Sequence, residues 1–174
     1  MKVPFNSFGF SKCSNPKRCK CCSYANTNHL LSNKINLPLE IPCKSTCESK
    51  NIVYILQCTK CNVFYVGESS RSFRIRFLEH IYRIKYLKSN LSNISLIEKF
   101  NENNVNCKIL YNHFAFNHEI ESDLKFQIFA TNLTTFRKRL ETVLMYLLNS
   151  IHPNGLNHGP SFTINTIENY SLVI

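Results

Sequence analysis

Two short apolar runs on either side of a cysteine pair constrain the fold of this chain more than any other stretch. Residues 52–56 (IVYIL) and 63–66 (VFYV) are rich in β-branched and aromatic side chains, which is typical of buried strands. The connection between them contains Cys58 and Cys61 (CTKC). Two thiols at this spacing in a hairpin turn are a common half of a zinc site. The stretch therefore predicts a β-hairpin with a metal half-site at its tip.

Candidates for the other half of that site lie far along the chain. His113 and His118 (HFAFNH) have a spacing that suits zinc ligands. The alternative is a pair of free cysteines and an unrelated pair of surface histidines. We favour one four-ligand zinc site, because both halves have ligand spacing and the cysteines lie at a turn.

Residues 1–50 are a cysteine-rich head with few periodic apolar positions. Cys19 and Cys22 have the spacing of a zinc knuckle. A polar segment this short needs such a site in order to fold. Other cysteines can complete a four-thiolate site: Cys13 and Cys47, with Cys21 and Cys43 as competitors. We predict an N-terminal zinc-binding extension over 1–50 and a second part over 51–174, and a leader with free thiols is the alternative to the zinc site.

Composition and charge narrow the class of protein. The chain has nine cysteines and a formal net charge of +10. We identify no secretory signal, so we expect a reducing compartment, where clustered cysteines bind metal more often than they pair. A disulfide-rich secreted basic protein is the weaker alternative. The charge favours a polyanionic partner, nucleic acid first, and no run of about 18 apolar residues predicts a membrane span.

A basic helix is predicted over 72–88, after a turn that Gly67 permits. Its buried stripe is predicted to be Phe73, Phe77, Ile81 and Ile84. Arg76, His80 and Arg83 share a different face of this helix, and a guanidinium suits phosphate. Four basic residues in and around this helix are candidate DNA contacts: Arg71, Arg74, Arg83 and Lys85. A solvated helix face is the alternative, and a second helix is predicted over 92–103.

The last third of the chain predicts a strand over 124–130 and a helix from Thr134 or Thr135 to Ile151. Glu141 borders the apolar stripe of this helix, where a carboxylate is costly unless it is paired or binds a cation. One alternative is a salt bridge to Arg137. The other is a Mg²⁺ ligand, because Mg²⁺ needs only one or two protein carboxylates.

These ordered motifs resemble the GIY-YIG nuclease superfamily, most closely the endonuclease domain of Penelope-like retroelements. The resemblance spans about residues 13–157. It rests on VY (53–54), CTKC (58–61), YVGESSRSF (65–73), RFLEH (76–80), HFAFNH (113–118), RLETVLMYLLN (139–149) and HPNGLN (152–157). Ile-Val-Tyr stands here for Gly-Ile-Tyr, and Tyr-Val-Gly for Tyr-Ile-Gly. That branch usually lacks the first glycine and carries an inserted CCHH zinc motif, which Cys58, Cys61, His113 and His118 match. The cysteines upstream resemble its cysteine-rich lead-in.

The resemblance implies a small α/β fold, in which helices flank a three-stranded antiparallel sheet. It implies that Tyr54 is the general base, with Tyr65 beside it. Arg76 would stabilise the scissile phosphate, and His80 would assist in positioning or proton transfer. Glu141 would hold the catalytic metal, and Asn157 would buttress the site. Without that support, Tyr54 and Tyr65 are more often packing residues.

The function so implied is a DNA endonuclease that hydrolyses phosphodiester bonds in retroelement integration. It would need Mg²⁺ or Mn²⁺ for catalysis and Zn²⁺ for structure. Its expected partners are double-stranded DNA and a reverse transcriptase with its element RNA, in the nucleus. The alternative is a non-catalytic, zinc-stabilised DNA-binding module.

Overall fold

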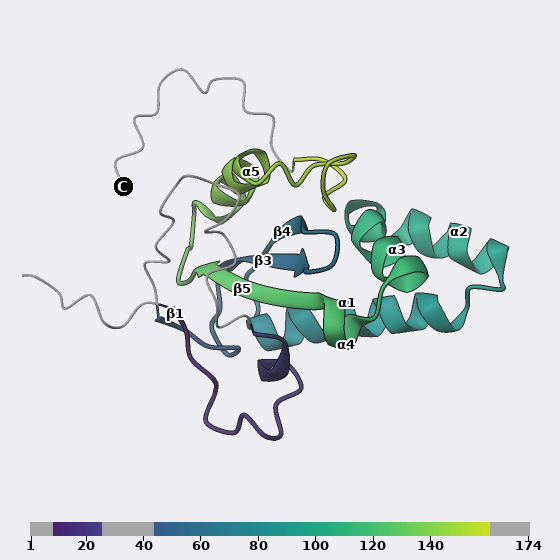
Figure 1. Ribbon diagram of the computed structural model, residues 1–174. Helices are drawn as coiled ribbons and strands as arrows, with labels where there is room; N and C mark the ends of the chain where they lie inside the picture. Colours follow the sequence, from purple (N-terminus) through teal and green to yellow (C-terminus); the bar gives the residue numbers. More distant parts are fainter. Residues whose placement is uncertain (1–8, 26–43, 161–174) are drawn as a thin grey trace, which may run out of the picture.

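The computed structural model describes residues 9–25 and 44–160, and Figure 1 shows their arrangement. The central sheet has three strands: β3 (Ile52–Cys58), β4 (Val63–Ser69) and β5 (Leu124–Ala130). The middle strand, β3, pairs antiparallel with both neighbours. The predicted α/β fold with a three-stranded antiparallel sheet is therefore confirmed. β4 extends past its predicted end, so Gly67 lies inside a strand and not in the predicted turn.

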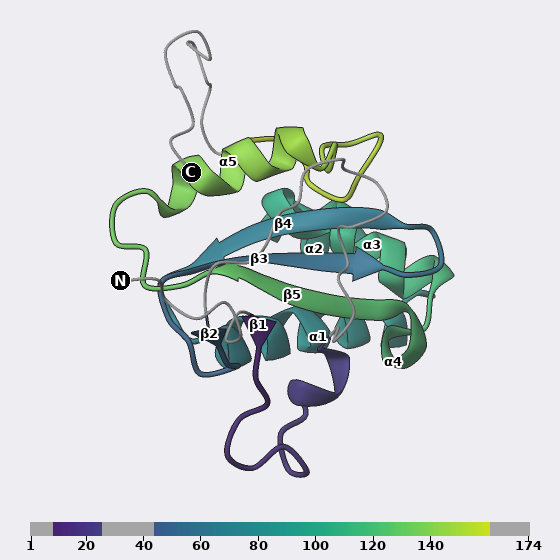
Figure 2. The same cartoon turned by 60° about the vertical axis from the view of Figure 1, so that its left-hand side comes forward.

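Alternate residues of β3 point to opposite faces of the sheet. Tyr54 and Leu56 belong to a core cluster shared with α1 (Phe73–Ser89) and α3 (Lys108–Asn117). Val53 and Ile55 belong to a smaller cluster shared with α5 (Arg137–Leu147). We call these the α1 face and the α5 face. Figure 2 shows α5 on one side of the sheet and α1 on the other.

The first helix begins after Ser72, as predicted, and ends at Ser89. Its buried residues recur at helical spacing: Phe73, Phe77, His80, Ile84 and Leu87. His80 therefore lies in the buried stripe, and not on the separate face predicted for it with Arg76 and Arg83. Ile81, predicted in the stripe, is only partly buried.

Four helical segments follow before β5. α2 (Ile94–Asn103) begins later than predicted, because the Asn93 side chain caps it by accepting from the Leu96 N–H at 3.1 Å. The short η2 (Val105–Cys107) leads into α3, and α4 (Ile120–Asp123) precedes β5. The sequence analysis predicted neither α3 nor α4. None of the helices in the described ranges combines the length and apolar character needed to span a membrane.

The last helix, α5, is shorter at both ends than predicted. Its N-cap is Phe136 and not a threonine, and it ends at Leu147. Arg137, at its first turn, forms an ion pair with Glu68 of β4 and donates to Asn51 at 3.2 Å. These contacts fix the start of α5 against the sheet.

The described head residues cover one edge of the sheet. β1 (Gly9–Phe10) pairs parallel with β2 (Lys44–Ser45), and η1 (Cys22–Tyr24) follows the first cysteines. Ala25 then forms a bridge to Phe126 of β5. At the opposite edge, the Leu156 N–H donates to the Phe64 carbonyl of β4 at 2.8 Å. Both outer strands thus have partners, which protects the sheet from pairing with other chains.

Candidate functional site

Two tyrosines occupy the centre of the α1 face. In the register, Tyr54 lies opposite Gly67, and Tyr65 lies opposite Leu56. The two ring centroids are 6.4 Å apart. A Cβ atom at Gly67 would lie 2.5 Å from the Tyr54 hydroxyl oxygen. The Y-V-G motif therefore needs its glycine because the ring of Tyr54 lies across this position of β4.

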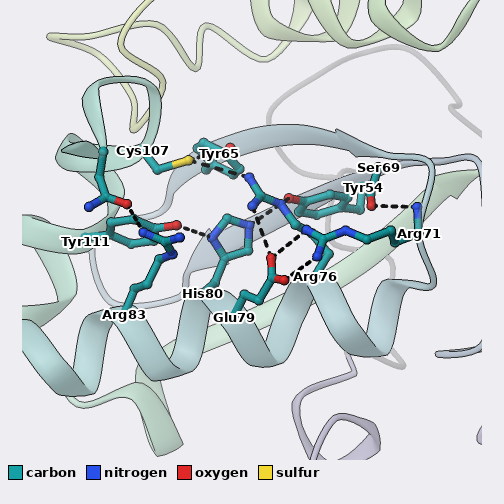
Figure 3. Close-up of polar contacts among 11 residues, drawn as sticks. Tyr54, Tyr65, Ser69, Arg71, Arg76, Glu79, His80, Arg83, Cys107 and Tyr111 are labelled. Atoms are coloured by element: carbon teal, nitrogen blue, oxygen red, sulfur yellow. Dashed lines mark hydrogen bonds and ion pairs between the residues drawn. The ribbon is translucent and has the colours of Figure 1, made fainter.

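The first helix brings a guanidinium and an imidazole to the Tyr54 hydroxyl (Figure 3). Arg76 Nε donates to Tyr54 Oη at 3.2 Å, and His80 Nε2 lies 2.7 Å from the same oxygen. Arg76 and His80 are one helical turn apart, so both side chains extend over the sheet at the same place. A guanidinium can only donate, so the Tyr54 oxygen accepts from Arg76 and its own hydrogen is available to His80 Nε2.

Burial determines the protonation of this pair. Tyr54 and His80 are both 0% exposed. Burial raises the pKa of Tyr54 above its ordinary value, although the charge of Arg76 opposes this shift. Burial also lowers the pKa of His80 well below its ordinary value, and the charges of Arg76 and Arg83 lower it further. Tyr54 and His80 are therefore both neutral at pH 7.

Two residues that the sequence analysis did not select complete the network. The Tyr111 hydroxyl lies 3.1 Å from His80 Nδ1. Cys107 Sγ lies 3.3 Å from the Tyr65 hydroxyl and 3.7 Å from Arg76 Nη2. A signal for both exists in the sequence, because Cys107, Tyr111 and Phe114 recur at helical spacing. The prediction used only the histidine spacing of that stretch.

Glu141 comes from α5, on the far side of β4. Its side chain is buried (6% exposed), and its charge contributes to the raised pKa of Tyr54. The helix that carries Glu141 packs on the α5 face of the sheet, whereas Tyr54 lies on the α1 face. A single carboxylate fits Mg²⁺ only where water and phosphate oxygens complete the coordination sphere.

Asn157 supports the site through the backbone. Its amide accepts from the Val66 N–H at 2.9 Å and donates to the Val66 carbonyl at 2.7 Å. The Ser150 hydroxyl donates to the same amide oxygen at 2.8 Å. These bonds fix β4 at the residue between Tyr65 and Gly67, so Asn157 positions both of them.

The four predicted DNA contacts all have protein partners. Arg71 binds Glu79 through both guanidinium nitrogens, and Arg83 donates to Asn104. Lys85 pairs with Glu121 at 2.7 Å. Arg74 lies beside the head cysteines, where it donates to Cys47 Sγ at 3.3 Å and pairs with Glu48 at 2.9 Å.

The two predicted halves of the hairpin metal site lie together. The ligand atoms of four residues are all within 4.8 Å of one another: Cys58, Cys61, His113 and His118. His118 Nε2 lies 3.2 Å from Cys61 Sγ, and its Nδ1 lies 3.2 Å from an Asp123 oxygen, as is usual for a metal-binding histidine. His113 Nε2 is buried without a hydrogen-bond partner in the described ranges, and burial lowers the pKa of His113 to about 4. A buried neutral imidazole without a partner is suited to a metal ion.

The head cysteines form a second cluster that could hold a metal ion. Its members are Cys13, Cys19, Cys22 and Cys47. Cys22 Sγ lies 3.5 Å from Cys13 Sγ and 3.8 Å from Cys47 Sγ. Cys47 Sγ also lies 3.6 Å from Cys19 Sγ. Zinc–sulfur bonds of about 2.3 Å in a tetrahedron require sulfur separations of about 3.8 Å. The spacing is therefore compatible with structural zinc.

The structure separates the competing cysteines of the head. Cys21 is fully buried and lies outside the cluster, and burial raises its pKa. Cys43 lies outside the described residues. For Cys19, burial raises the pKa but hydrogen bonds from the backbone N–H groups of Cys22 and Cys21 outweigh it, and the net pKa is about 7. A thiol with a lowered pKa is favourable for metal binding.

The structure thus joins a neutral tyrosine–histidine pair to a fixed guanidinium on the α1 face. It also holds a buried carboxylate on α5 and two clusters of metal-ligating side chains. Comparisons of the chain with protein-family models, with curated proteins and with solved structures found no match.

Proposed function

We propose that this chain is a divalent-metal-dependent DNA endonuclease of the GIY-YIG type. The observation that carries the proposal is the convergence of Tyr54, Arg76 and His80 within hydrogen-bonding distance. The buried Glu141 carboxylate of α5 is the candidate ligand for the catalytic metal. A formal net charge of +10 suits a nucleic-acid substrate.

Tyr54 and His80 act together as the base. The attacking water gives a proton to Tyr54 Oη while Tyr54 passes its own hydrogen to His80 Nε2, so that no buried phenolate accumulates. The resulting hydroxide attacks phosphorus, the P–O bond to the leaving sugar oxygen breaks, and that oxygen takes a proton from water. His80 Nδ1 donates its hydrogen to the Tyr111 hydroxyl, which keeps Nε2 free to accept. This path avoids a free phenolate, which the raised pKa of Tyr54 disfavours, and the lowered pKa of His80 makes its protonated form short-lived, so that the proton is returned to solvent after the attack.

Arg76 binds the scissile phosphate and controls access to Tyr54. Its side chain is 22% exposed and lies 3.5 Å from Glu79 Oε2. A phosphate competes with Glu79 for the guanidinium, because both are oxyanions. Movement of Arg76 towards the phosphate uncovers the Tyr54 hydroxyl for the attacking water.

The catalytic metal and the two zinc ions would have different roles. Glu141 would hold Mg²⁺ or Mn²⁺, which supplies charge stabilisation at the leaving oxygen when bound. Zinc at the hairpin cluster would fix α3, which carries Tyr111, against the β3–β4 turn. Zinc at the head cluster would fix the segments around β1 and β2. Double-stranded DNA, a reverse transcriptase with its element RNA, and a nuclear role in retroelement integration remain part of the proposal through the family resemblance.

Nicking of supercoiled plasmid in Mg²⁺ or Mn²⁺ tests this function. Tyr54→Phe should slow nicking by about 10²–10⁴-fold, because positioned proton transfer contributes that much. Glu141→Gln keeps the side-chain shape, removes the charge and should abolish metal-dependent nicking. Glu98→Gln, on the exposed side of α2, is the matched control and should nick like the wild type.

The complete burial of Tyr54 favours a second candidate, a non-catalytic zinc-stabilised DNA-binding module. A hydroxyl covered by Arg76 serves packing as well as it serves catalysis. This candidate predicts salt-sensitive DNA binding that Glu141→Gln leaves unchanged. If the wild type bound plasmid but never nicked it in Mg²⁺, Mn²⁺ or Co²⁺, the endonuclease proposal would be abandoned in favour of the binding module.

A further inference from the structure

The solvent side of α1 carries an apolar stripe that the core does not use. Ile75, Tyr82 and Tyr86 are 50%, 70% and 38% exposed. They recur at helical spacing on the side of α1 that faces away from the sheet. The other stripe of α1 already fills the core. Exposed aromatic residues grouped on one surface indicate a site of interaction.

This stripe forms one wall of a groove of about 960 Å³ between α1 and α2. The second helix contributes Leu96, Lys99 and Phe100 to the other wall. None of the residues of α2 is fully buried. The two helices therefore leave an open apolar channel between them.

The rings in the groove form a stack. The centroids of Tyr82 and Tyr86 are 6.5 Å apart with 23° between the ring planes, and those of Tyr86 and Phe100 are 5.8 Å apart with 27°. Tyr82 is the outer ring, and its exposure leaves room for a planar group to extend the stack. Phe100 meets Tyr111 edge-on at 5.9 Å, and the Tyr111 hydroxyl contacts His80. The groove also borders Arg76, because Glu79 lines it and lies 3.5 Å from the Arg76 guanidinium.

The charges in the groove suit a polyanion. Arg83 and the exposed Lys99 line it together with Glu79. Glu79 is already paired with Arg71 through two hydrogen bonds, and this pairing lowers the pKa of Glu79 although burial opposes the shift. The net charge presented by the groove is thus positive. These cations would not contribute to the binding of an apolar peptide helix. They would pair with the phosphates of a nucleic-acid strand.

We propose that the groove between α1 and α2 binds a single-stranded nucleic-acid segment. Unstacked bases would extend the Tyr82–Tyr86 stack, and phosphates would lie near Arg83 and Lys99. The inference rests on the proposed nucleic-acid function, but not on cleavage. A duplex keeps its bases paired inside and cannot use the stack, so the preferred substrate has an unpaired stretch beside the scissile phosphate.

Fluorescence anisotropy with two labelled DNA probes tests this proposal. One is a thymidine oligonucleotide of about 12 nucleotides, within the site sizes of about 4–16 nucleotides typical of single-strand grooves, and the other is a hairpin duplex. Tyr82→Ala should weaken binding of the single strand by about 5- to 150-fold and leave the duplex almost unchanged. Tyr146→Ala, which removes another exposed tyrosine (49%) from α5, should change neither. Zinc content and circular dichroism establish that the variants are folded.

Two further measurements separate this proposal from the nuclease proposal. A thymidine oligonucleotide with one 5-iodouracil should cross-link on irradiation to Tyr82 or Tyr86, as located by peptide mass spectrometry. Glu141→Gln should bind the single strand like the wild type, whether or not it nicks DNA. If Tyr82→Ala bound the oligonucleotide as tightly as Tyr146→Ala did, the groove would have a different occupant, such as a protein, and the proposal would fail. Equal weakening of the single strand and the duplex would also overturn it.

Discussion

The two faces of the central sheet are built differently, although the same strands form both. On the α1 face, Tyr54 and Tyr65 lie among apolar residues, and cysteines of both metal clusters belong to the same core. On the α5 face, residues such as Val53, Ile55 and Phe64 pack against a single helix. A buried hydroxyl or imidazole needs a partner, whereas a buried methyl group needs only filled space.

This difference has a consequence for stability. The central polar groups of the α1 face are satisfied by groups from other elements, as Tyr54 is by His80 and Arg76 of α1. Loss of one contact leaves its partner unsatisfied, so the α1 face should depend on metal and on pH. The α5 face should depend less on both, because its apolar cluster contains none of the metal-ligating cysteines, although the Glu141 carboxylate is buried on the same helix.

The largest effect is expected from loss of metal at the head cluster. Cys22→Ala removes one of four thiols and should lower the zinc content from about two ions per chain to about one. The expected loss of stability is several kcal/mol or more, because structural zinc contributes on the order of 10 kcal/mol of binding free energy to folding. Inductively coupled plasma mass spectrometry and urea denaturation measure the two quantities.

The head provides its own control. Cys21 is buried beside the cluster but contributes no ligand atom to it. Cys21→Ala should keep the full zinc content and lose only the packing of one sulfur. If Cys21→Ala released zinc as Cys22→Ala does, the ligand set described above would be wrong.

The next effect is expected on the α5 face. Leu144 is 1% exposed within the apolar cluster. Leu144→Ala should cost about 2–5 kcal/mol of unfolding free energy through the cavity it leaves, with zinc content unchanged. Leu147→Ala, on the same helix but 39% exposed, should cost less than about 1 kcal/mol. Release of zinc by Leu144→Ala would mean that the two faces unfold as one cooperative unit.

The α5 face and the strands could be predicted from the sequence because the patterns that predict them lie in neighbouring residues. β-branched runs and helical stripes depend on neighbouring residues, and these gave β3, β5 and α1 nearly to the residue. The placement of His80 could not be predicted in the same way. The neighbouring residues of a basic helix do not predict that its histidine is buried. His80 is buried because the hydroxyls of Tyr54 and Tyr111 contact the two nitrogens of its ring.

The ligand sets of the two metal clusters could also be predicted from the sequence only in part. Ligand spacing predicted that Cys58 and Cys61 would meet His113 and His118, because zinc geometry restricts the pairs that can share an ion. Spacing favoured Cys22 as the partner of Cys19 but left Cys21 and Cys43 as competitors for the remaining places. The fold chooses, since only Cys22 places its sulfur within 3.5 Å of that of Cys13 and 3.8 Å of that of Cys47.

A smaller effect on stability, with a large effect on function, is expected at Gly67. Gly67→Ala places a methyl group 2.5 Å from the Tyr54 hydroxyl oxygen and 2.8 Å from the Tyr65 ring. Overpacking of this kind costs about 1–3 kcal/mol. Nicking should fall far more than plasmid binding, because the hydroxyl moves away from Arg76 and His80. Gly159→Ala, where a Cβ meets nothing within 4 Å, is the control. Equal stability and nicking of Gly67→Ala and the wild type would contradict the placement of Tyr54.

The smallest effect is the pH dependence that His80 gives to the α1 face. Burial lowers the pKa of His80 in the folded chain well below 6.5, whereas the unfolded chain keeps the ordinary value. Below about pH 6.5 the unfolded chain therefore binds a proton that the folded chain does not. Stability is complete above that pH and is lost as the pH falls towards the folded pKa, by at most about 1.4 kcal/mol per pH unit.

Urea denaturation between pH 7.5 and pH 5.5 measures this contribution in His80→Gln against the wild type. The variant should be less stable at the upper pH, because Tyr54 and Tyr111 lose a matched partner, but its stability should fall less steeply on acidification. Acid release of zinc affects both proteins and cancels in the difference of slopes. His152→Gln, at an exposed position, should show the wild-type slope of stability against pH. Leu144→Ala should lower the stability at every pH but leave that slope unchanged. If His80→Gln and the wild type had equal slopes, the imidazole would be protonated in the folded state, and the proton path from Tyr54 to His80 would be closed.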